Sequence, residues 1–379
     1  MKVLYANPAG HDYLHASLLE GLGRRTDIEL WCLQEGNYGG RAHHCLHGDG
    51  AQALEMLADF DVVVIGSAGK RGSFRDPVGG LLHAPKASAG QRWVLVDSCD
   101  LGSLPRLDVS WSKFSAVLKR ERYLQDRSVR NFLSVAAARR MRHPVGAQFR
   151  GHPLLPFPNV QCNMQARPAL AVLTQRRVWR LPRGVPVRCE PIGVEPRLVQ
   201  PFNDSPDRFV TCTLTANIQA RREIRSWLAG RDDVRCDLIP AQDDEPVDLV
   251  ATGAVAPDRR GEFAHNSAYL AWLRANRASI TFPGAGFDTA RFWEILASGS
   301  LLISKRISLD LPVPLHEGRH YVAFDSLREL DDAIRFAVSD SSEVDEIRRR
   351  GYELALADYS SAAMAERFVT NELRGPGQT

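Results

Sequence analysis

Apolar positions along the chain alternate between two periods. Short runs in which nearly every residue is apolar, such as 3–6, 60–66 and 93–97, are typical of strands that are covered on both faces of a sheet. Between such runs lie segments with apolar residues at helical spacing, the first of them over 13–23. Strand-like runs that alternate with helices predict an α/β fold with a parallel sheet and helices on both of its faces.

This alternation fades between 145 and 201, a stretch rich in proline and arginine that we interpret as a connector. After it, a second alternation begins. We expect strands over 209–214, 234–239, 278–282 and 301–303, and helices over 219–228, 269–274, 290–298, 327–338, 343–357 and 361–373. The predicted division is therefore a first domain with its connector over 1–200, a second over 201–360, and a C-terminal helix with a polar tail over 361–379.

Composition agrees with a folded protein of more than one domain. The chain has 379 residues, of which 44% are hydrophobic and 25% charged, as in ordinary globular proteins. The formal net charge of +3 does not by itself indicate nucleic-acid binding. All but six of the 48 basic residues are arginine, the side chain that binds phosphate and carboxylate through paired hydrogen bonds.

Cysteine spacing and hydropathy indicate the compartment. The seven cysteines are far apart and include no C-x-x-C pair, so neither a disulfide framework nor a zinc site is predicted. No segment approaches the 18 or more apolar residues that a transmembrane helix requires. We therefore expect a cytoplasmic protein with reduced thiols.

The most informative segment for function follows the strand predicted over 278–282. Gly284 and Gly286 form a glycine-rich loop whose backbone can approach a ligand closely, and the helix after it offers unpaired N–H groups and a positive dipole end. Asp288, Arg291 and Glu294 are spaced by three and lie along one face of that helix. This arrangement predicts an anion site in which Arg291 holds a phosphate and Glu294 accepts hydrogen bonds from ribose hydroxyls.

A purely structural interpretation of the same segment is also open. Asp288 can cap the helix, Arg291 can pair with Asp288 or Glu294, and the glycines can serve only the turn. The nucleotide fingerprint G-x-G-x-x-G is absent, because Thr289 stands where the third glycine belongs. A dinucleotide-dependent oxidoreductase is therefore disfavoured.

The run Arg-Phe-Trp-Glu-Ile-Leu-Ala-Ser-Gly at 291–299, with the Leu-Leu-Ile strand after it and the Glu-Gly turn at 317–318, resembles the C-terminal half of GT-B glycosyltransferases, especially the CgeB-like (spore maturation protein) group. The resemblance covers about 270–370. Weaker similarities extend it along the chain: His-Asp-Tyr-Leu at 11–14, Leu-Lys-Arg-Glu-Arg at 118–122, and Thr213–Leu214 with Arg221–Arg222.

This resemblance implies two Rossmann-like, doubly wound domains that face a central cleft. A nucleotide-sugar donor would bind mainly to the C-terminal domain, and a hydroxyl acceptor would enter from the N-terminal side. Glu294 matches the glutamate that binds the donor ribose, whereas Gly286 replaces a second glutamate common in GT-B enzymes, which leaves the donor-sugar contact and the stereochemical outcome open. The implied donor-binding residues are Arg221, Gly284, Gly286, Asp288, Thr289, Arg291 and Glu294.

On the acceptor side, His11 follows the first strand and is a candidate base for an acceptor hydroxyl, since histidine exchanges a proton near neutral pH. Asp12 can orient His11 or cap the next helix, and His11 can instead merely close the turn. The resemblance places Lys119, Arg120 and Glu121 toward the cleft. The alternative is that Lys119, Arg120 and Arg122 form a solvated face, as basic clusters more often do.

Other charged features carry less information. The arginine clusters at 139–142, 176–183 and 348–350 are expected on the surface, with contact to an anionic membrane or an acidic acceptor as the alternative. No Asp-x-Asp pair stands at a strand end, so we predict neither a metal nor another cofactor, because arginines and a helix dipole can stabilise the leaving diphosphate.

We therefore expect a glycosyltransferase that moves a sugar from a nucleotide diphosphate to an acceptor hydroxyl. A non-catalytic module that binds sugar nucleotides or glycans, which Gly286 favours, and a nucleotide-sugar epimerase are the alternatives. The nucleotide, the sugar, the acceptor and the oligomeric state are not predicted, because a fold does not determine them.

Overall fold

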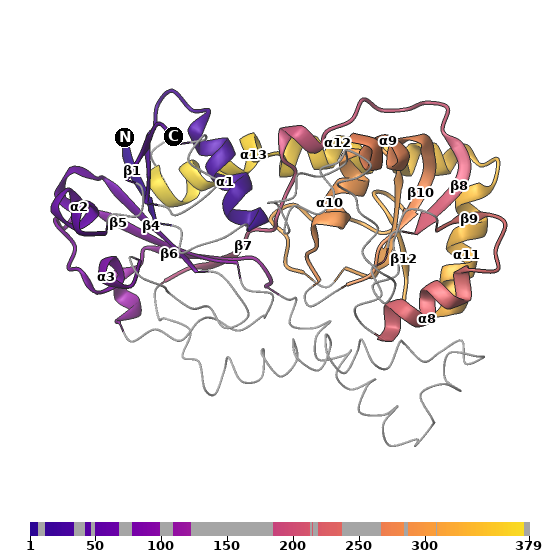
Figure 1. Cartoon of the computed structure of the whole chain (residues 1–379), viewed down its shortest axis with the longest axis horizontal. Coiled ribbons are helices and arrows are strands. Elements are labelled where there is room, and N and C mark those ends of the chain that lie inside the picture. The colour runs from indigo at the N-terminus through magenta and orange to yellow at the C-terminus, as the bar shows by residue number, and fades with distance from the viewer. Residues whose placement is uncertain are drawn as a thin grey trace, which may run out of the picture.

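The described part of the chain forms two lobes, each built around a parallel sheet (Figure 1). The structure is a computed structural model of the chain. It describes residues 1–6, 12–33, 42–46, 50–67, 78–98, 109–122, 185–212, 214, 219–236, 267–283, 287–307 and 309–374.

The first lobe contains a seven-stranded sheet with the order β3-β2-β1-β4-β5-β6-β7, and every neighbouring pair is parallel. Its central strands are almost fully buried, as the uninterrupted apolar runs predict. The strands are β1 (Lys2–Ala6), β2 (Glu29–Leu33), β3 (His44–Cys45), β4 (Val62–Ser67), β5 (Arg92–Asp97), β6 (Ala116–Lys119) and β7 (Val187–Cys189), and the helices are α1 (Tyr13–Gly23), α2 (Gly50–Glu55) and α3 (Val78–His83).

The second lobe contains a five-stranded parallel sheet with the order β12-β11-β10-β8-β9. Its strands are β8 (Asp207–Cys212), β9 (Val234–Arg235), β10 (Asn276–Ile280), β11 (Leu301–Lys305) and β12 (Val322–Phe324). Its helices are α8 (Gln219–Leu228), α9 (Ser267–Ala275), α10 (Ala290–Ala297), α11 (Leu327–Val338) and α12 (Ser342–Tyr359). Strand order reverses on either side of β8, so β8 and β10 form the topological switch point of this sheet.

The chain returns to the first lobe at its end. After Ser360, which has an extended backbone, α13 (Ser361–Phe368) packs against α1, and a π-helical turn (Val369–Arg374) follows it (Figure 1). Met364 and Phe368 belong to the same apolar core as Leu14 and Leu18 of α1. The C-terminal segment is therefore part of the first lobe in space, although it follows the second lobe in sequence.

The two chain crossings between the lobes are bonded to each other. Val194, in the segment that leads from the first sheet to the second, donates to the carbonyl of Tyr359 over 2.7 Å and accepts from the backbone N–H of Ser361 over 2.9 Å. Beside it, Gly193 has a φ of 72° and lies so close to Met364 and Tyr359 that a Cβ atom would overlap them. This position therefore requires glycine for both its backbone conformation and its lack of a side chain.

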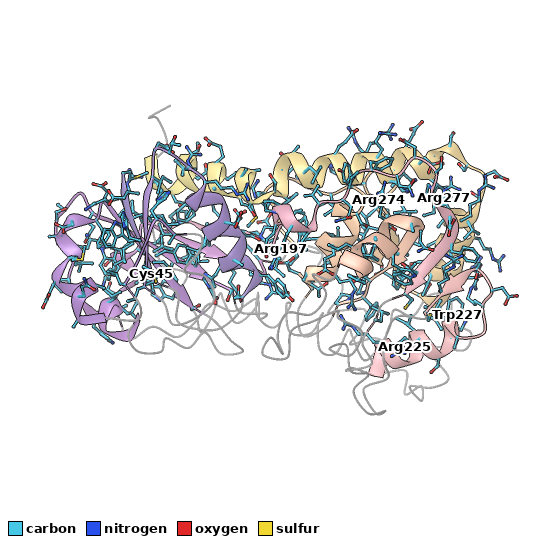
Figure 2. All side chains as sticks on the ribbon, turned by 45° about the horizontal axis from the view of Figure 1, so that its top comes forward. Cys45, Arg197, Arg225, Trp227, Arg274 and Arg277 are labelled. Atoms are coloured by element: carbon cyan, nitrogen blue, oxygen red, sulfur yellow. The ribbon has the colours of Figure 1, made fainter. Side chains whose placement is uncertain are left out.

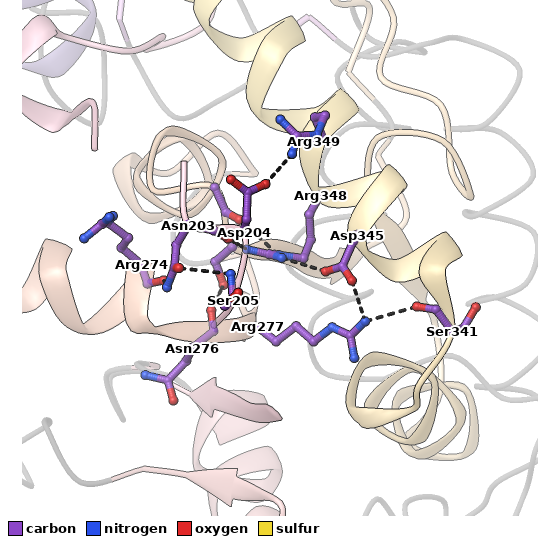
Figure 3. Close-up of polar contacts among 12 residues, drawn as sticks. Asn203, Asp204, Ser205, Arg274, Asn276, Arg277, Ser341, Asp345, Arg348 and Arg349 are labelled. Carbon is purple, nitrogen blue, oxygen red and sulfur yellow. Dashed lines mark hydrogen bonds and ion pairs between the residues drawn. The ribbon is translucent and has the colours of Figure 1, made fainter. Parts of the chain in front are cut away.

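A buried arginine on α12 holds the entry segment of the second lobe (Figure 3). Arg348 donates to the carbonyl oxygens of Asn203 (2.9 Å) and Gly299 (3.1 Å) and to the carboxylate of Asp345 (2.7 Å). Arg277 reaches the other oxygen of that carboxylate over 2.9 Å. The expectation that 348–350 is a surface cluster is therefore wrong for Arg348, which is only 2% exposed, because its side chain donates to two backbone carbonyls and to Asp345 in place of water.

Candidate functional site at the switch point of the second sheet

Charged side chains gather where β8 and β10 end. In open parallel sheets, ligands bind outside the carboxyl ends of the strands at the point where strand order reverses. Arg221 lies in the first turn of α8, which follows β8, and Arg291 lies in the first turn of α10. The fold thus brings together two arginines that are 70 positions apart in sequence and that sequence analysis assigns to the donor diphosphate.

Arg221 bridges the switch point. Its Nε and Nη2 atoms donate to the carbonyl oxygen of Phe282, just beyond β10, over 3.2 and 2.6 Å. Burial and the nearby positive charge of Arg291 lower the pKa of Arg221 to about 10. Two neighbouring guanidinium groups repel each other in a site with little water, so a doubly charged anion between them would relieve that repulsion.

Arg291, Glu294 and Tyr269 form a hydrogen-bonded group on the adjoining faces of α9 and α10. Burial raises the pKa of Glu294 to about 7, and the charge of Arg291 together with a hydrogen bond from Tyr269 opposes this rise. The proximity of Tyr269 and Glu294 raises the pKa of Arg291, although burial acts in the opposite direction. Glu294 therefore exchanges its proton near neutral pH. Sequence analysis missed Tyr269, which lies on another helix.

The first lobe and the connecting segment also contribute to this group. Burial, followed by the negative charges of Glu294 and Glu195, raises the pKa of Tyr13 in α1 to about 12. Glu195 is paired with Arg197 over 3.0 Å, and Figure 2 shows Arg197 between the two lobes. The site therefore joins the start of the first lobe to the second, and Tyr13 is another residue that sequence reasoning did not single out.

Under the carboxyl ends of the first sheet lies a buried polar network. The hydroxyl of Tyr5 is 2.7 Å from Nδ1 of His15, whose Nε2 is 3.3 Å from the carbonyl oxygen of Ser67. The Ser67 hydroxyl donates to Asp97 over 2.8 Å, and Asp97 is paired with Lys119 over 3.0 Å. Four strand ends and α1 are thus linked by polar contacts. This network could have been predicted from the sequence, because polar Ser67 and Asp97 each end an apolar run that is typical of a buried strand.

Most of the candidate residues that the sequence predicts in the first lobe lie within the described ranges. Asp12 caps α1 by accepting from the backbone N–H groups of Leu14 (3.0 Å) and His15 (3.3 Å), one of the two roles expected for it. Lys119 is 1% exposed and the Arg120 side chain 12%, so the expected solvated face is wrong for these two residues, whereas Arg122 is exposed; Glu121 is fully buried. His11 lies outside the described residues.

The glycine loop and the start of α10 are partly described. Gly284 and Gly286 fall outside the described residues, whereas Thr289 is the N-cap of α10 and makes no side-chain capping hydrogen bond. Asp288 does not cap the helix. It is 2% exposed and accepts from Trp293 Nε1 over 2.7 Å and from the backbone N–H of Ile192 over 2.7 Å. Asp288 therefore lies buried at the contact between the lobes and is not part of an open surface for a ligand.

A separate cavity of about 270 Å³ lies at the lobe junction between β6, β7, the loop after β11 and the C-terminal helix. Its three arginines are each paired with an acid of the same cavity: Arg122 with Asp310, Arg188 with Glu372, and Arg367 with Glu190. Because these charges already compensate one another, we do not assign the cavity to the candidate site.

The residues that the structure describes contain neither a cluster of metal ligands nor a helix that could span a membrane. In this part of the chain, no group of three or more His, Cys, Asp or Glu side chains is arranged to hold a metal ion. None of the helices described is both long and apolar enough to span a bilayer. The cysteines in the described ranges are free thiols: Cys32, Cys45, Cys189, Cys212 and Cys236.

A family model matches part of the chain. Residues 220–370 match the family model described as "Glycosyl transferase-like", and this range contains Arg221, Tyr269, Arg291 and Glu294. A search of curated proteins finds no match.

Solved structures resemble the whole chain. A glycosyltransferase from Rickettsia africae ESF-5 is 10% identical, with 97% of each chain covered and a TM-score of 0.50. Alr3699/HepE from Anabaena, solved with UDP-glucose, is 12% identical over 98% of each chain, with a TM-score of 0.49. AviGT4, a glycosyltransferase of avilamycin A biosynthesis, is 14% identical over 98% of this chain and 97% of that one, with a TM-score of 0.46.

Together with the two parallel sheets, the likeness to the Rickettsia africae structure confirms the predicted fold class, which is α/β of the GT-B type. The glycosyl transferase-like region covers most of the second lobe and contains Arg221, Tyr269, Arg291 and Glu294 of the candidate site, whereas Tyr13 lies outside it.

Proposed function

We propose that this protein is a glycosyltransferase that transfers a sugar from a nucleotide diphosphate donor to an acceptor hydroxyl. The observation that carries the proposal is the group formed by Arg221, Arg291, Glu294 and Tyr269 at the switch point of a glycosyl transferase-like region. The resemblance to the CgeB-like group and the division into domains at 200 and 360 belong to the same proposal.

Each residue has a proposed role that follows from its chemistry. Arg221 and Arg291 would bind the diphosphate and stabilise the negative charge that develops on it as the sugar leaves. The carboxylate of Glu294 would accept hydrogen bonds from the donor ribose, and the loop at 284–286 with Thr289 would supply backbone N–H groups. His11 remains our proposed base for the acceptor hydroxyl. Because two cations already face the diphosphate, we propose turnover without a metal or other cofactor.

A binding module without turnover is the alternative favoured by a specific residue. Gly286 stands where many GT-B enzymes have a glutamate beside the donor sugar, and glycine offers no side-chain group to that sugar. Such a module would keep affinity for the nucleotide without releasing it from the donor. An assay that measures both nucleotide binding and nucleotide release therefore distinguishes the glycosyltransferase from the binding module.

The test is incubation of the full chain with UDP-, GDP- and dTDP-sugars and a panel of hydroxyl acceptors, followed by detection of free nucleoside diphosphate and of glycosylated product. Arg291→Ala and Glu294→Ala should each reduce donor affinity at least about tenfold, as expected for loss of a charged hydrogen-bond partner in a buried site. Addition of EDTA should leave turnover unchanged.

Matched controls are available on the surface of the same lobe. Arg335, 71% exposed on α11, and Glu346, 58% exposed on α12, can be replaced by alanine in the same way. These controls should bind donor as the unmodified protein does. Binding without nucleotide release would favour the module, isomerised donor would favour an epimerase, and no binding of any nucleotide would overturn the proposed site.

A further inference from the structure

Asp288 is the point at which both lobes and their connecting segment meet. Its backbone N–H donates to Glu121 Oε1 over 2.9 Å, and its carbonyl oxygen accepts from Arg120 Nη2. Of its carboxylate oxygens, Oδ1 accepts from Trp293, and Oδ2 accepts from Ile192 N and lies 3.4 Å from Arg120 Nε. One residue of the second lobe is thus held by the two residues just after β6 of the first lobe, by the connecting segment and by α10.

The partners from the first lobe are themselves held firmly. Arg120 continues the ladder of β6, because its backbone N–H donates to the carbonyl of Asp97 over 3.0 Å, and its Nη1 donates to the carbonyl of Ser98 over 3.3 Å. Glu121, directly after it, is fully buried. Because these side chains have little freedom to move, the position of Asp288 depends on the position of the first sheet.

The junction is close to the donor residues along the chain. Asp288 immediately precedes Thr289, the N-cap of α10, and Arg291 and Glu294 lie in the first two turns of that helix. A shift of Asp288 moves the start of α10 and with it both donor residues. Because binding groups must hold their geometry to well within 1 Å to keep their effect, a small displacement is costly.

Removal of a partner here cannot be compensated by water. Burial raises the pKa of Asp288, and the charge of Arg120 together with hydrogen bonds from Trp293 and Ile192 opposes the rise. A buried donor or acceptor without its partner costs free energy, and a movement of Asp288 or of the lobes would reduce that cost. The contact therefore links the relative position of the lobes to the orientation of α10.

We infer that Arg120, Glu121 and Asp288 are positioning residues for donor binding, which fix the first turn of α10 when the lobes meet. This inference rests on the proposed function. The three residues act through Arg291 and Glu294 and need not touch the donor.

The ion pair between Arg122 and Asp310 provides a matched control. Arg122 also reaches from the end of β6 to an aspartate of the second lobe, Asp310, over 3.2 Å, but both side chains are about half exposed. Asp310→Asn therefore makes the same chemical change at the same lobe boundary in a solvated place, where an ion pair contributes at most about 1 kcal/mol.

The experiment compares Asp288→Asn, Glu121→Ala, Glu121→Gln and Asp310→Asn in the full chain. For each, UDP affinity is measured by calorimetry well below the unfolding temperature, and hydrogen exchange is measured in α10. We expect Asp288→Asn and Glu121→Ala to weaken UDP binding at least about tenfold and to speed exchange in the first turns of α10. Glu121→Gln keeps an acceptor oxygen for Asp288 N–H and should restore most of the affinity, and Asp310→Asn should change neither quantity.

Loss of folded protein alone would not alter the affinity of the molecules that remain folded, so this measurement separates positioning from stability. Unchanged UDP affinity in folded Asp288→Asn or Glu121→Ala, or an equal loss in Asp310→Asn, would overturn the inference. Should Asp288→Asn not fold, the two Glu121 variants decide. Should the unmodified protein bind neither UDP, GDP nor dTDP, the proposed function fails, and hydrogen exchange in α10 alone shows whether the junction positions that helix.

Discussion

At the scale of single residues, burial decides the chemistry of the candidate site. Glu294 is 2% exposed, and its pKa is raised to about 7 because a carboxylate loses more hydration on burial than Arg291 and Tyr269 return. The same carboxylate on the surface would be ionised at any physiological pH. Perturbed groups of this kind gather at functional sites, although structural ion pairs produce them as well.

The raised pKa predicts a pH-dependent stability. The unfolded chain ionises Glu294 near 4.5 and the folded chain near 7, so the folded state binds the extra proton between these values and loses stability as pH rises through them. Glu294→Gln does not titrate. Its stability relative to the unmodified protein should therefore increase by about 3 kcal/mol from about pH 4 to about pH 8.

Urea unfolding at the two pH values measures this difference. Glu346→Gln, an exposed change on the same lobe, should reproduce the pH profile of the unmodified protein. An equal stability difference for Glu294→Gln at both pH values would show that the carboxyl is not buried as described.

At the scale of elements, helix starts and their neighbours determine where the site lies. Asp288, just before α10, accepts from the backbone N–H of Ile192, and the carbonyl of Gly299, just after α10, accepts from Arg348. Both contacts come from segments distant in sequence, so α10 is fixed at each end by the tertiary structure.

Arg348→Met should destabilise the protein by about 2–4 kcal/mol, because the carbonyls of Gly299 and Asn203 lose a buried donor. The neighbouring Arg349, half exposed and paired with exposed Asp204, is the control, and Arg349→Met should cost less than about 1 kcal/mol. Chemical denaturation measures both. Similar losses for the two variants would mean that burial of Arg348 does not matter for stability.

At the scale of the whole molecule, the two lobes are joined by the connecting segment and by the passage from α12 to α13. Both crossings meet at the paired backbone of Val194 and Ser361. Because α13 completes the core beside α1, the first lobe depends on the last residues of the chain.

Gly21→Ala tests the packing of α13 on α1. A Cβ atom at Gly21 would lie 1.9 Å from the carbonyl oxygen of Ser361, so the helices must separate, and we expect a loss of about 1–3 kcal/mol despite the better helix propensity of alanine. In Gly80→Ala, the new atom would meet nothing closer than 3.9 Å, so this control should be neutral or stabilising. Thermal unfolding distinguishes them, and equal melting temperatures for the two variants would contradict the close approach of α1 and α13.

Much of the fold follows from local sequence patterns. The helices at 219–228 and 327–338 have the predicted bounds, and the strands at 62–67 and 92–97 differ from prediction by one or two residues, because period and apolar runs are local properties. The strand expected over 234–239 is shorter: β9 ends at Arg235, and 237–239 lie outside the described residues. The helix expected over 361–373 changes to a π-helical turn at Val369, which its own sequence does not indicate.

The candidate site was predictable only in part. The sequence by itself determined that a strand, a glycine loop and a helix with Arg291 and Glu294 follow one another, since that depends on spacing alone. Only the tertiary structure decided that Tyr13 and Tyr269 join them, that Arg120 and Glu121 hold Asp288 at the lobe junction, and that Arg348 is buried. The physical reason is that partners from distant segments and the exclusion of water determine hydrogen bonding and pKa, and neither can be read from residues taken one after another.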